Sequence, residues 1–200
     1  MKFKSVLVTT LLFAGIATAA NAQRDAAYLG GKIGMNIATM TNSDDMDARI
    51  GLNVGLFGQY FVTNTFALQG EINYSQQGVK DSDDGTTGTV KLDYLNIPIL
   101  AKFYPMVKGF NVYAGPQFGF AVNKEIKASG GGASISVDLD DYVKTFDFGI
   151  ALGLGYDFDF GLTLDGRWTP GLTGVFKSEY LDGFDNSKNS VFTISVGYKF

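Results

Sequence analysis

The chain has 200 residues, which suits a single domain. It contains no cysteine and no histidine, which excludes disulfides, thiolate or imidazole metal sites, and the catalytic triads that need these residues. Its 16 basic and 20 acidic residues give a net charge of -4, so the basic footprint of a nucleic-acid-binding protein is not expected.

The chain begins with the pattern of a secretory signal peptide. Lys2 and Lys4 give a positive start, residues 6–17 are apolar, and small residues ending at Ala22 form an A-x-A cleavage site. An uncleaved anchor helix is the weaker alternative, because the apolar run is short for a membrane span and no stop-transfer pattern follows. We predict a signal peptide over residues 1–22 and an outer-membrane β-barrel domain over residues 23–200.

Apolar and polar residues alternate in eight later stretches, which is the pattern of β-strands with one apolar face. The predicted strands cover residues 27–38, 50–61, 66–79, 89–104, 110–125, 144–158, 162–171 and 190–200. No later run of about 18 apolar residues could form a spanning helix. A membrane-spanning form of this chain must therefore be a closed barrel, since lipid offers no partner to unpaired backbone groups.

The connections between these strands alternate in length. Short turns are predicted at residues 62–65, 105–109 and 159–161, and long polar loops at residues 39–49, 80–88, 126–143 and 172–189. Short turns at one end and long loops at the other are typical of the periplasmic and extracellular ends of an outer-membrane barrel. Both termini then lie at the short-turn end.

Two features favour lipid, rather than water, outside the barrel. The polar faces carry glycine and amides instead of lysine and glutamate, with amides in residues 51–59 and glycine in both 51–59 and 147–157. Aromatic residues gather beside the short turns, as in an interfacial girdle. They are Tyr60, Phe61, Phe66, Phe103, Tyr104, Phe110, Phe158, Phe160, Tyr198 and Phe200. We predict an all-β, closed, antiparallel, eight-stranded transmembrane barrel; a soluble lipocalin-like barrel, with its apolar face inside, is the distant alternative.

The apolar face of this barrel is expected to point outward. The residues that test this are Leu52, Val54, Leu56, Phe146, Phe148, Ile150, Ile194 and Val196.

Several blocks resemble a known family. Residues 91–103 (K-L-D-Y-L-N-I-P-I-L-A-K-F) resemble the signature strand of the PorT-like outer-membrane β-barrel family, and residues 113–117 (Y-A-G-P-Q) resemble its next strand. Residues 147–156, 167–168 and 171–173 resemble later blocks. The resemblance implies location in the cell outer membrane of a Gram-negative bacterium. Members are described mostly as porin-like, and a few assist a secretion system. The size resembles the barrels of OmpA and OmpX.

Charged residues on inward-facing positions predict a network in the lumen. Glu71, Lys102, Asp165 and Arg167 lie at similar heights above the short turns, and Lys32 joins them from the first strand. Charges inside a narrow barrel must pair, since burying one alone is costly. We predict salt bridges around Arg167 and Glu71 that plug the lumen; an ion-selective constriction is the weaker alternative, because an eight-stranded barrel has little spare volume.

Two further expectations concern the strands. Pro98 and Pro116 should lie close across the hairpin around residue 107, and a proline cannot donate to a ladder, so a bulge or missing bonds is expected there. Residues 190–200 alternate and end on Phe200, which resembles the closing strand and insertion signal read by the barrel assembly machinery.

The sequence predicts no catalytic, cofactor-binding or metal-binding residue. Gly153 and Gly155 lack the remainder of a dinucleotide fingerprint, and residues 81–85 lack the order of a calcium loop. Residues 130–132 (G-G-G) indicate a flexible linker in a long loop.

Two classes of function remain: a monomeric interaction scaffold with exposed loops and no open pore, or porin-like passage of small solutes. The expected partners are outer-membrane lipid and lipopolysaccharide, the assembly machinery, and a protein at the loops.

Overall fold

The computed structural model describes residues 27–41, 46–83, 86–105, 109–130, 133–177 and 187–200. The predicted signal peptide over residues 1–22 lies outside these residues. No helix in the described part of the chain is long and apolar enough to cross a membrane.

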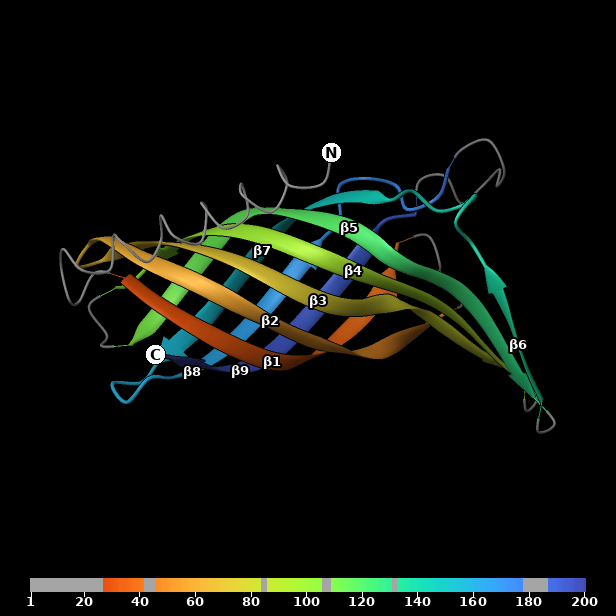
Figure 1. Ribbon diagram of the computed structural model, residues 1–200, viewed down its shortest axis with the longest axis horizontal. Coiled ribbons are helices and arrows are strands. Elements are labelled where there is room, and N and C mark those ends of the chain that lie inside the picture. The colour runs from red at the N-terminus through yellow and green to blue at the C-terminus, as the bar shows by residue number, and fades with distance from the viewer. Residues whose placement is uncertain (1–26, 42–45, 84–85, 106–108, 131–132, 178–186) are drawn as a thin grey trace, which may run out of the picture.

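Within the described residues the chain forms nine strands (Figure 1). They are β1 (Ala27–Met40), β2 (Asp47–Thr63), β3 (Phe66–Asp83), β4 (Thr86–Phe103), β5 (Phe110–Gly130), β6 (Ala133–Asp138), β7 (Phe146–Asp157), β8 (Leu162–Pro170) and β9 (Asn189–Lys199). All pairings are antiparallel, and β1 pairs with both β2 and β9. The eight strands other than β6 thereby close a ring, as predicted.

The apolar face of the ring points outward. All but one of the residues chosen to test this are exposed, from Ile150 at 38 % to Leu56 at 63 %, while Phe148 is half-buried against the ring of Phe118. The inward face carries buried amides, hydroxyls and charges, such as Asn73 and Thr193. The prediction of a lipid-facing exterior is confirmed, and the soluble alternative is excluded.

The two prolines interrupt the ladders around β4, as predicted. Between β4 and β5 the pairing stops at Pro98 opposite Gln117 and resumes at Ala101 opposite Ala114. Gly115 lies in this gap, where a Cβ would come within 1.9 Å of the backbone oxygen of Ile99, so only glycine fits. The β3–β4 ladder has a matching gap between Gly70 and Asn73.

The predictions of two loops are wrong, because strands extend into the residue ranges that were assigned to them. β3 continues to Asp83 and β4 begins at Thr86, where a loop was predicted over residues 80–88. Within the predicted loop at 126–143, β5 continues to Gly130 and β6 pairs back onto it. Gly130 is therefore the last residue of a strand, and the rest of the predicted linker, residues 131–132, lies outside the described part of the chain.

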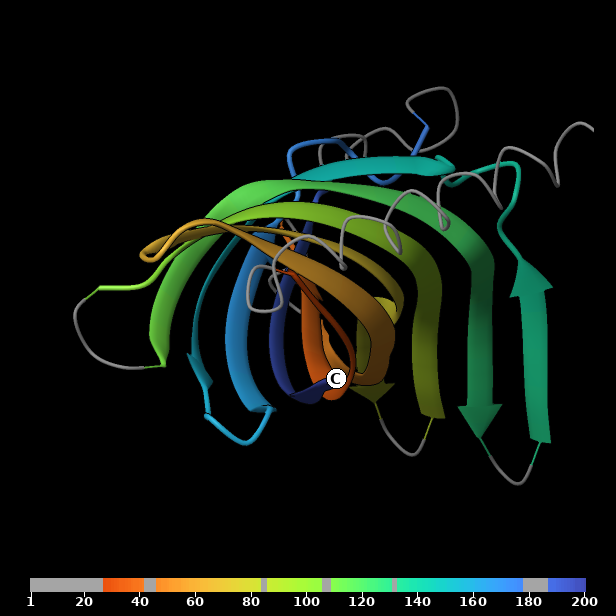
Figure 2. The same cartoon turned by 60° about the vertical axis from the view of Figure 1, so that its left-hand side comes forward.

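The parts of β3, β4 and β5 that lie farthest from the short turns form, together with β6, a sheet that projects beyond the ring (Figures 1 and 2). We call it the protruding sheet, and we use 'above' for the direction away from the short turns. Along β3 the outward face is apolar or aromatic from Phe66 to Tyr74, which matches the roughly 9–11 residues that a transmembrane strand needs. We call this level of the barrel the apolar band.

The two faces exchange polarity above the apolar band. The outward face becomes polar at Gln76 in β3, Asp93 in β4 and Asn123 in β5, which lie opposite one another. The inner face becomes apolar, because Val90 in β4 lies opposite both Val79 in β3 and Ile126 in β5, and directly opposed residues share a face. The protruding sheet is therefore built as a sheet in water, with its apolar side turned inward.

Lysine substitution at Ile194 tests the outward apolar face. Ile194 lies near the middle of β9 and is 52 % exposed. Ile194→Lys is expected to lower the free energy of unfolding by about 2–4 kcal/mol, because a lysine facing lipid at midplane is costly. Urea unfolding in lipid vesicles measures the change.

The matched control is Ile135→Lys in β6, where Ile135 is 70 % exposed beyond the apolar band. Its effect on the free energy of unfolding should stay below about 1 kcal/mol, since the new charge remains in water. Equal effects of the two substitutions would contradict the outward apolar face.

Candidate functional site

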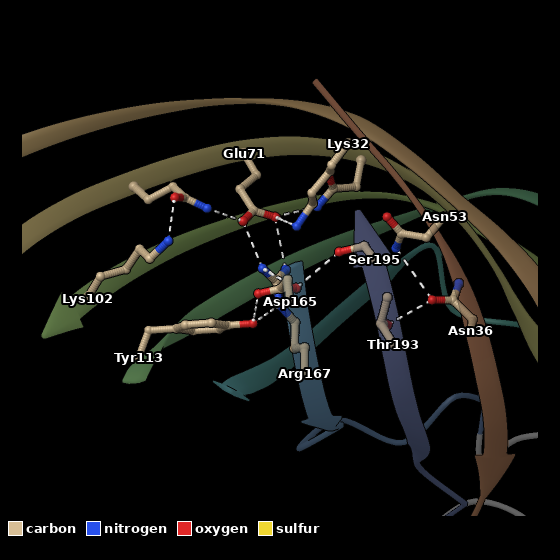
Figure 3. A network of polar contacts seen from close by, with 12 residues as sticks. Lys32, Asn36, Asn53, Glu71, Lys102, Tyr113, Asp165, Arg167, Thr193 and Ser195 are labelled. Atoms are coloured by element: carbon tan, nitrogen blue, oxygen red, sulfur yellow. Dashed lines mark hydrogen bonds and ion pairs between the residues drawn. The ribbon is translucent and has the colours of Figure 1, made fainter. Parts of the chain in front are cut away.

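The centre of the lumen is occupied by a buried pair, Arg167 of β8 and Glu71 of β3 (Figure 3). The Nη1 and Nη2 atoms of Arg167 donate to the two carboxylate oxygens of Glu71 at 2.9 and 2.7 Å. The two side chains are 4 % and 0 % exposed. Such a forked pair crosses the lumen between two strands that are not neighbours in the ring, so it spans the interior.

Three more side chains complete the hydrogen bonding of Glu71. Lys32 Nζ from β1 lies 2.7 Å from Oε2. Gln69 Nε2 donates to Oε1 at 2.6 Å, and Asn73 Nδ2 donates to Oε2 at 2.8 Å. A buried carboxylate with two cationic and two amide donors is fully compensated, so it is not free to act as a general base.

Asp165 lies beside this pair and binds mainly to hydroxyl groups. Its carboxylate accepts hydrogen bonds from the hydroxyls of Tyr113 and of Ser195, the latter at 3.2 Å. Arg167 Nη2 lies 3.8 Å from Asp165 Oδ1, and Arg167 Nε donates to Tyr113 Oη at 3.2 Å. The structure thus places Lys32, Glu71, Asp165 and Arg167 in one contiguous charge layer.

Lys102 belongs to a second layer nearer the short turns. It contacts the first layer through Gln69, whose Oε1 lies 3.2 Å from Lys102 Nζ, and through the ring of Tyr113, whose centroid lies 5.9 Å away. Its carboxylate neighbour is Asp157 at 3.8 Å, and Lys199 Nζ binds the same carboxylate at 2.8 Å. Sequence reasoning missed Asp157 and Lys199, which alternation alone placed on inward faces without indicating their pairing.

Tyr104 caps this second layer from beyond the end of β4. Its hydroxyl donates to Asp157 Oδ2 at 2.7 Å and accepts from Gln59 Nε2 at 3.0 Å. Burial and the neighbouring Asp157 carboxylate raise the pKa of the Tyr104 hydroxyl, so it remains a proton donor. The predicted aromatic girdle is therefore wrong at Tyr104, which turns into the mouth of the barrel and packs against Phe61 with ring centroids 5.1 Å apart.

Above the first charge layer the lumen is filled by neutral polar groups. Asn36 Nδ2 donates to Ser75 Oγ at 2.9 Å, and Thr193 Oγ1 donates to Asn36 Oδ1 at 2.8 Å. Figure 3 shows Asn36, Asn53 and Thr193 beside the charged residues. These side chains come from β1, β2, β3 and β9, so they occupy the side of the lumen that these strands line.

An apolar plug lies at the end of the barrel opposite the short turns. It joins residues on the inner faces of the strands to residues from the β6–β7 and β8–β9 connections. The buried members are Met40, Val79, Leu92, Tyr94, Leu139, Val143, Val175 and Phe176. Asp147 fastens one connection to the barrel, since it accepts from Thr173 Oγ1 at 2.5 Å and from Asn189 Nδ2 at 3.2 Å.

The remaining space within the described residues is uneven. Between the two charge layers lies a cavity of about 20 Å³ bordered by Lys32, Gln69 and Lys102, close to the size of one water molecule. A hollow of about 710 Å³ opens at the short-turn end, lined by Tyr28, Phe61 and other aromatic residues. The larger space thus lies at the short-turn end, whereas the cavity between the charge layers has room for about one water molecule.

The described residues hold no group of three acidic side chains suited to a metal ion. The charged residues of the lumen are paired and buried, so this arrangement fills and braces the interior.

Phe200 lies at the short-turn end beside Tyr198. It is 80 % exposed, and the two ring centroids are 5.7 Å apart. Its backbone N–H donates to the carbonyl oxygen of Leu29 at 2.8 Å, which extends the β1–β9 seam by one residue. The side chain is therefore accessible, and its role in assembly remains a prediction.

Residues 20–177 match the family described as outer membrane protein beta-barrel domain. The chain belongs to this family. It is an outer-membrane β-barrel protein, and the membrane that its exterior faces is the bacterial outer membrane. Outer-membrane barrels have their short turns on the periplasmic side. The connections after β2 and β7, the start of β1 and the end of β9 then lie on that side, and the protruding sheet lies outside the cell.

Solved barrels are similar in fold at low identity. Neisserial surface protein A is 14 % identical, with a TM-score of 0.49 over 87 % of this chain and 97 % of that one. The attachment invasion locus protein Ail of Yersinia pestis is 16 % identical, with a TM-score of 0.45 over 87 % and 97 %. OprG from Pseudomonas aeruginosa is 14 % identical, with a TM-score of 0.45 over 88 % and 96 %. No curated protein sequence matches.

Removal of the Arg167 side chain tests the central pair. Arg167→Ala is expected to lower the free energy of unfolding by about 3 kcal/mol, because it leaves the Glu71 carboxylate buried beside a single cation. Arg167→Lys should lower it less, since it keeps the charge and loses only the forked geometry. Urea unfolding in detergent measures both.

The control is Lys177→Ala, whose exposed ammonium binds a backbone carbonyl. That change should be within about 0.5 kcal/mol of wild type. A central pair that contributes no more than Lys177 would contradict the predicted role of Arg167.

Deletion of Phe200 tests the assembly signal. The truncated chain is expected to reach the periplasm normally but to insert at a reduced level, because the exposed terminal ring is the feature that we expect the machinery to read. The inserted fraction is measured by heat-dependent mobility on gels. Phe160→Ala is the matched control, since Phe160 is 65 % exposed in a turn at the same end. Equal insertion of both variants would refute the idea.

Proposed function

We propose that this protein is a closed scaffold of the outer membrane that presents its protruding sheet to a partner outside the cell. The observation that carries the proposal is that the strands continue well beyond the apolar band, above a lumen that is crossed by the Arg167–Glu71 pair and packed with apolar residues at its far end. A pore has no need of such an extension, and a membrane anchor alone has none either. The sheet is the part of the molecule that reaches a partner.

The side chains that fill the lumen support a closed barrel without a pore. A solute would have to separate Arg167 from Glu71, whose charge-assisted hydrogen bonds are buried, and then pass the apolar plug. Breaking a buried pair by stranding one charge costs about 3–5 kcal/mol. Porin-like passage is therefore the less favoured function, although the family resemblance carries that description.

The resemblance of β4 and β5 to the PorT-like signature supports membership of that group, including a role beside a secretion system. The paired state of the lumen carboxylates supports a non-enzymatic role. We further propose that the protein is a monomer surrounded by outer-membrane lipid and lipopolysaccharide and inserted by the barrel assembly machinery. The partner outside the cell is proposed to be a protein, since the sheet offers backbone and apolar side chains.

Photocrosslinking in intact cells tests the scaffold function. A photoreactive residue replaces Ile126 on the inner face of the protruding sheet, or Ile194 in the apolar band as a control of similar character. A discrete protein adduct from position 126 and only lipid adducts from position 194 are expected. An absence of protein adducts from position 126 would refute the scaffold function.

Conductance tests the closed lumen. Purified wild-type protein in planar bilayers is expected to show no steady current, because the charge layers and the plug leave no continuous path. Arg167→Ala should also remain silent, since the plug stays in place. Steady conduction by the wild type would overturn the closed scaffold in favour of the porin-like function.

A further inference from the structure

The last strand of the protruding sheet has a free edge without the residues that usually prevent pairing with another strand. Among the described residues β6 pairs with β5 on one side and with no strand on the other, so it ends the sheet (Figure 2). Every second residue of such an edge points its N–H and C=O groups away from the sheet. Natural free edges are normally protected by lysine, proline or a bulge. Residues 133–137 (A-S-I-S-V) contain none of these.

The inner face beside this edge is apolar and uncovered. Ile126 of β5 lies opposite Val137 of β6, and Ala128 lies opposite Ile135. Ile135 is 70 % exposed and Val137 is 57 % exposed, although the same face further down is buried in the plug. The plug therefore covers the lower part of this face and leaves the upper part next to β6 open.

We propose that the free edge of β6 binds an extended strand of a partner protein, which adds to the protruding sheet. This inference rests on the proposed scaffold function and names the class of partner. Backbone groups on the edge require a strand, and Ile135 with Val137 require apolar residues at alternate positions of that strand. The base of β6 carries Asp138, and Asp141 follows it, so a basic residue at the adjoining end of the partner strand complements the charge; Asp140 is already paired with Lys124.

A second copy of this chain fits the edge less well. Two copies in one membrane share their orientation, so a two-fold axis between them runs along the membrane normal. Such an axis reverses only the in-plane component of a strand's direction. β6 runs antiparallel to β5, a barrel strand that is inclined to the membrane normal, so a component of its direction along the normal is kept. Two β6 strands would therefore cross rather than run antiparallel.

A synthetic peptide, K-V-T-V-T-V-K, is the probe, because it alternates valine with threonine and carries a lysine at each end. Fluorescence anisotropy measures its binding to the full chain in detergent. The control peptide has the same sequence with alternate backbone nitrogens methylated, which removes N–H donors and keeps the side chains. The unmodified peptide is expected to bind, with new hydrogen-exchange protection of the β6 amides. The methylated peptide is expected to bind at least about tenfold more weakly.

Two lysine variants separate the apolar face from simple charge. Ile135→Lys places a charge on the inner face and should weaken peptide binding by about tenfold or more. Ser136→Lys places the same charge on the outer face of the same strand and should weaken it by no more than about threefold. Equal binding of the two peptides, or equal effects of the two variants, would overturn strand addition.

Disulfide crosslinking of Ser134→Cys tests whether a second copy of this chain occupies the edge instead. Efficient dimers through this position in cells would show that a second copy covers the edge and would overturn the proposed partner, whereas monomers support it. The peptide result is also separable from the scaffold function. If the peptide fails to bind while position 126 still gives a protein adduct in cells, strand addition is refuted and the scaffold stands.

Discussion

The inability of lipid to hydrogen-bond with a polypeptide backbone is the constraint on which this structure depends. It requires the ring of strands to close, which happens where β1 meets β9. Closure with eight strands leaves an interior just wide enough for side chains. Because the outward faces must be apolar, the alternation of side chains leaves the polar residues on the inward faces. Buried there, these polar side chains need hydrogen-bond partners, which they find mainly in one another. The forked pair of Arg167 and Glu71 is the local solution, with Lys32 balancing the remaining charge.

The same strands also continue from lipid into water, and their outward-facing side chains mark the level at which this happens. Below the boundary Tyr74 and Leu95 face outward to lipid, and above it Lys80 and Lys91 continue that face into water. The change occurs in adjacent strands at the same height, so it marks the edge of the membrane rather than a local irregularity. An apolar inner face above that edge has no lipid to meet. It must be covered by protein, which the plug does for its lower part.

The sequence predicted what depends on local periodicity and missed what depends on position around the ring. Alternation and turn length sufficed for the strand count of the barrel and for the outward face. Height above the short turns placed Glu71 and Arg167 at one level, where the structure brings them together. The height of Lys102 was misjudged, since it lies opposite Ala67, nearer the short turns than Glu71, and is therefore beside Gln69 and Asp157 instead. The strand β6 was missed because six residues between glycines and aspartates carry too little pattern to separate a strand from a loop.

The plug and the free edge are linked by the chain itself, and this bears on how well the edge can bind. Leu139 follows β6 directly and is buried in the plug, while its N–H donates to the carbonyl of Lys124 in β5 at 3.0 Å. Lys124 Nζ also donates to the backbone oxygen of Val143, another plug residue. The base of the hairpin is thereby held from both strands. A partner strand would meet an edge that is already ordered, and the entropy lost on binding falls mainly on the partner. The plug and the free edge are thus one construction, since Leu139 and Val143 pack in the plug and also hold the base of the hairpin through Lys124.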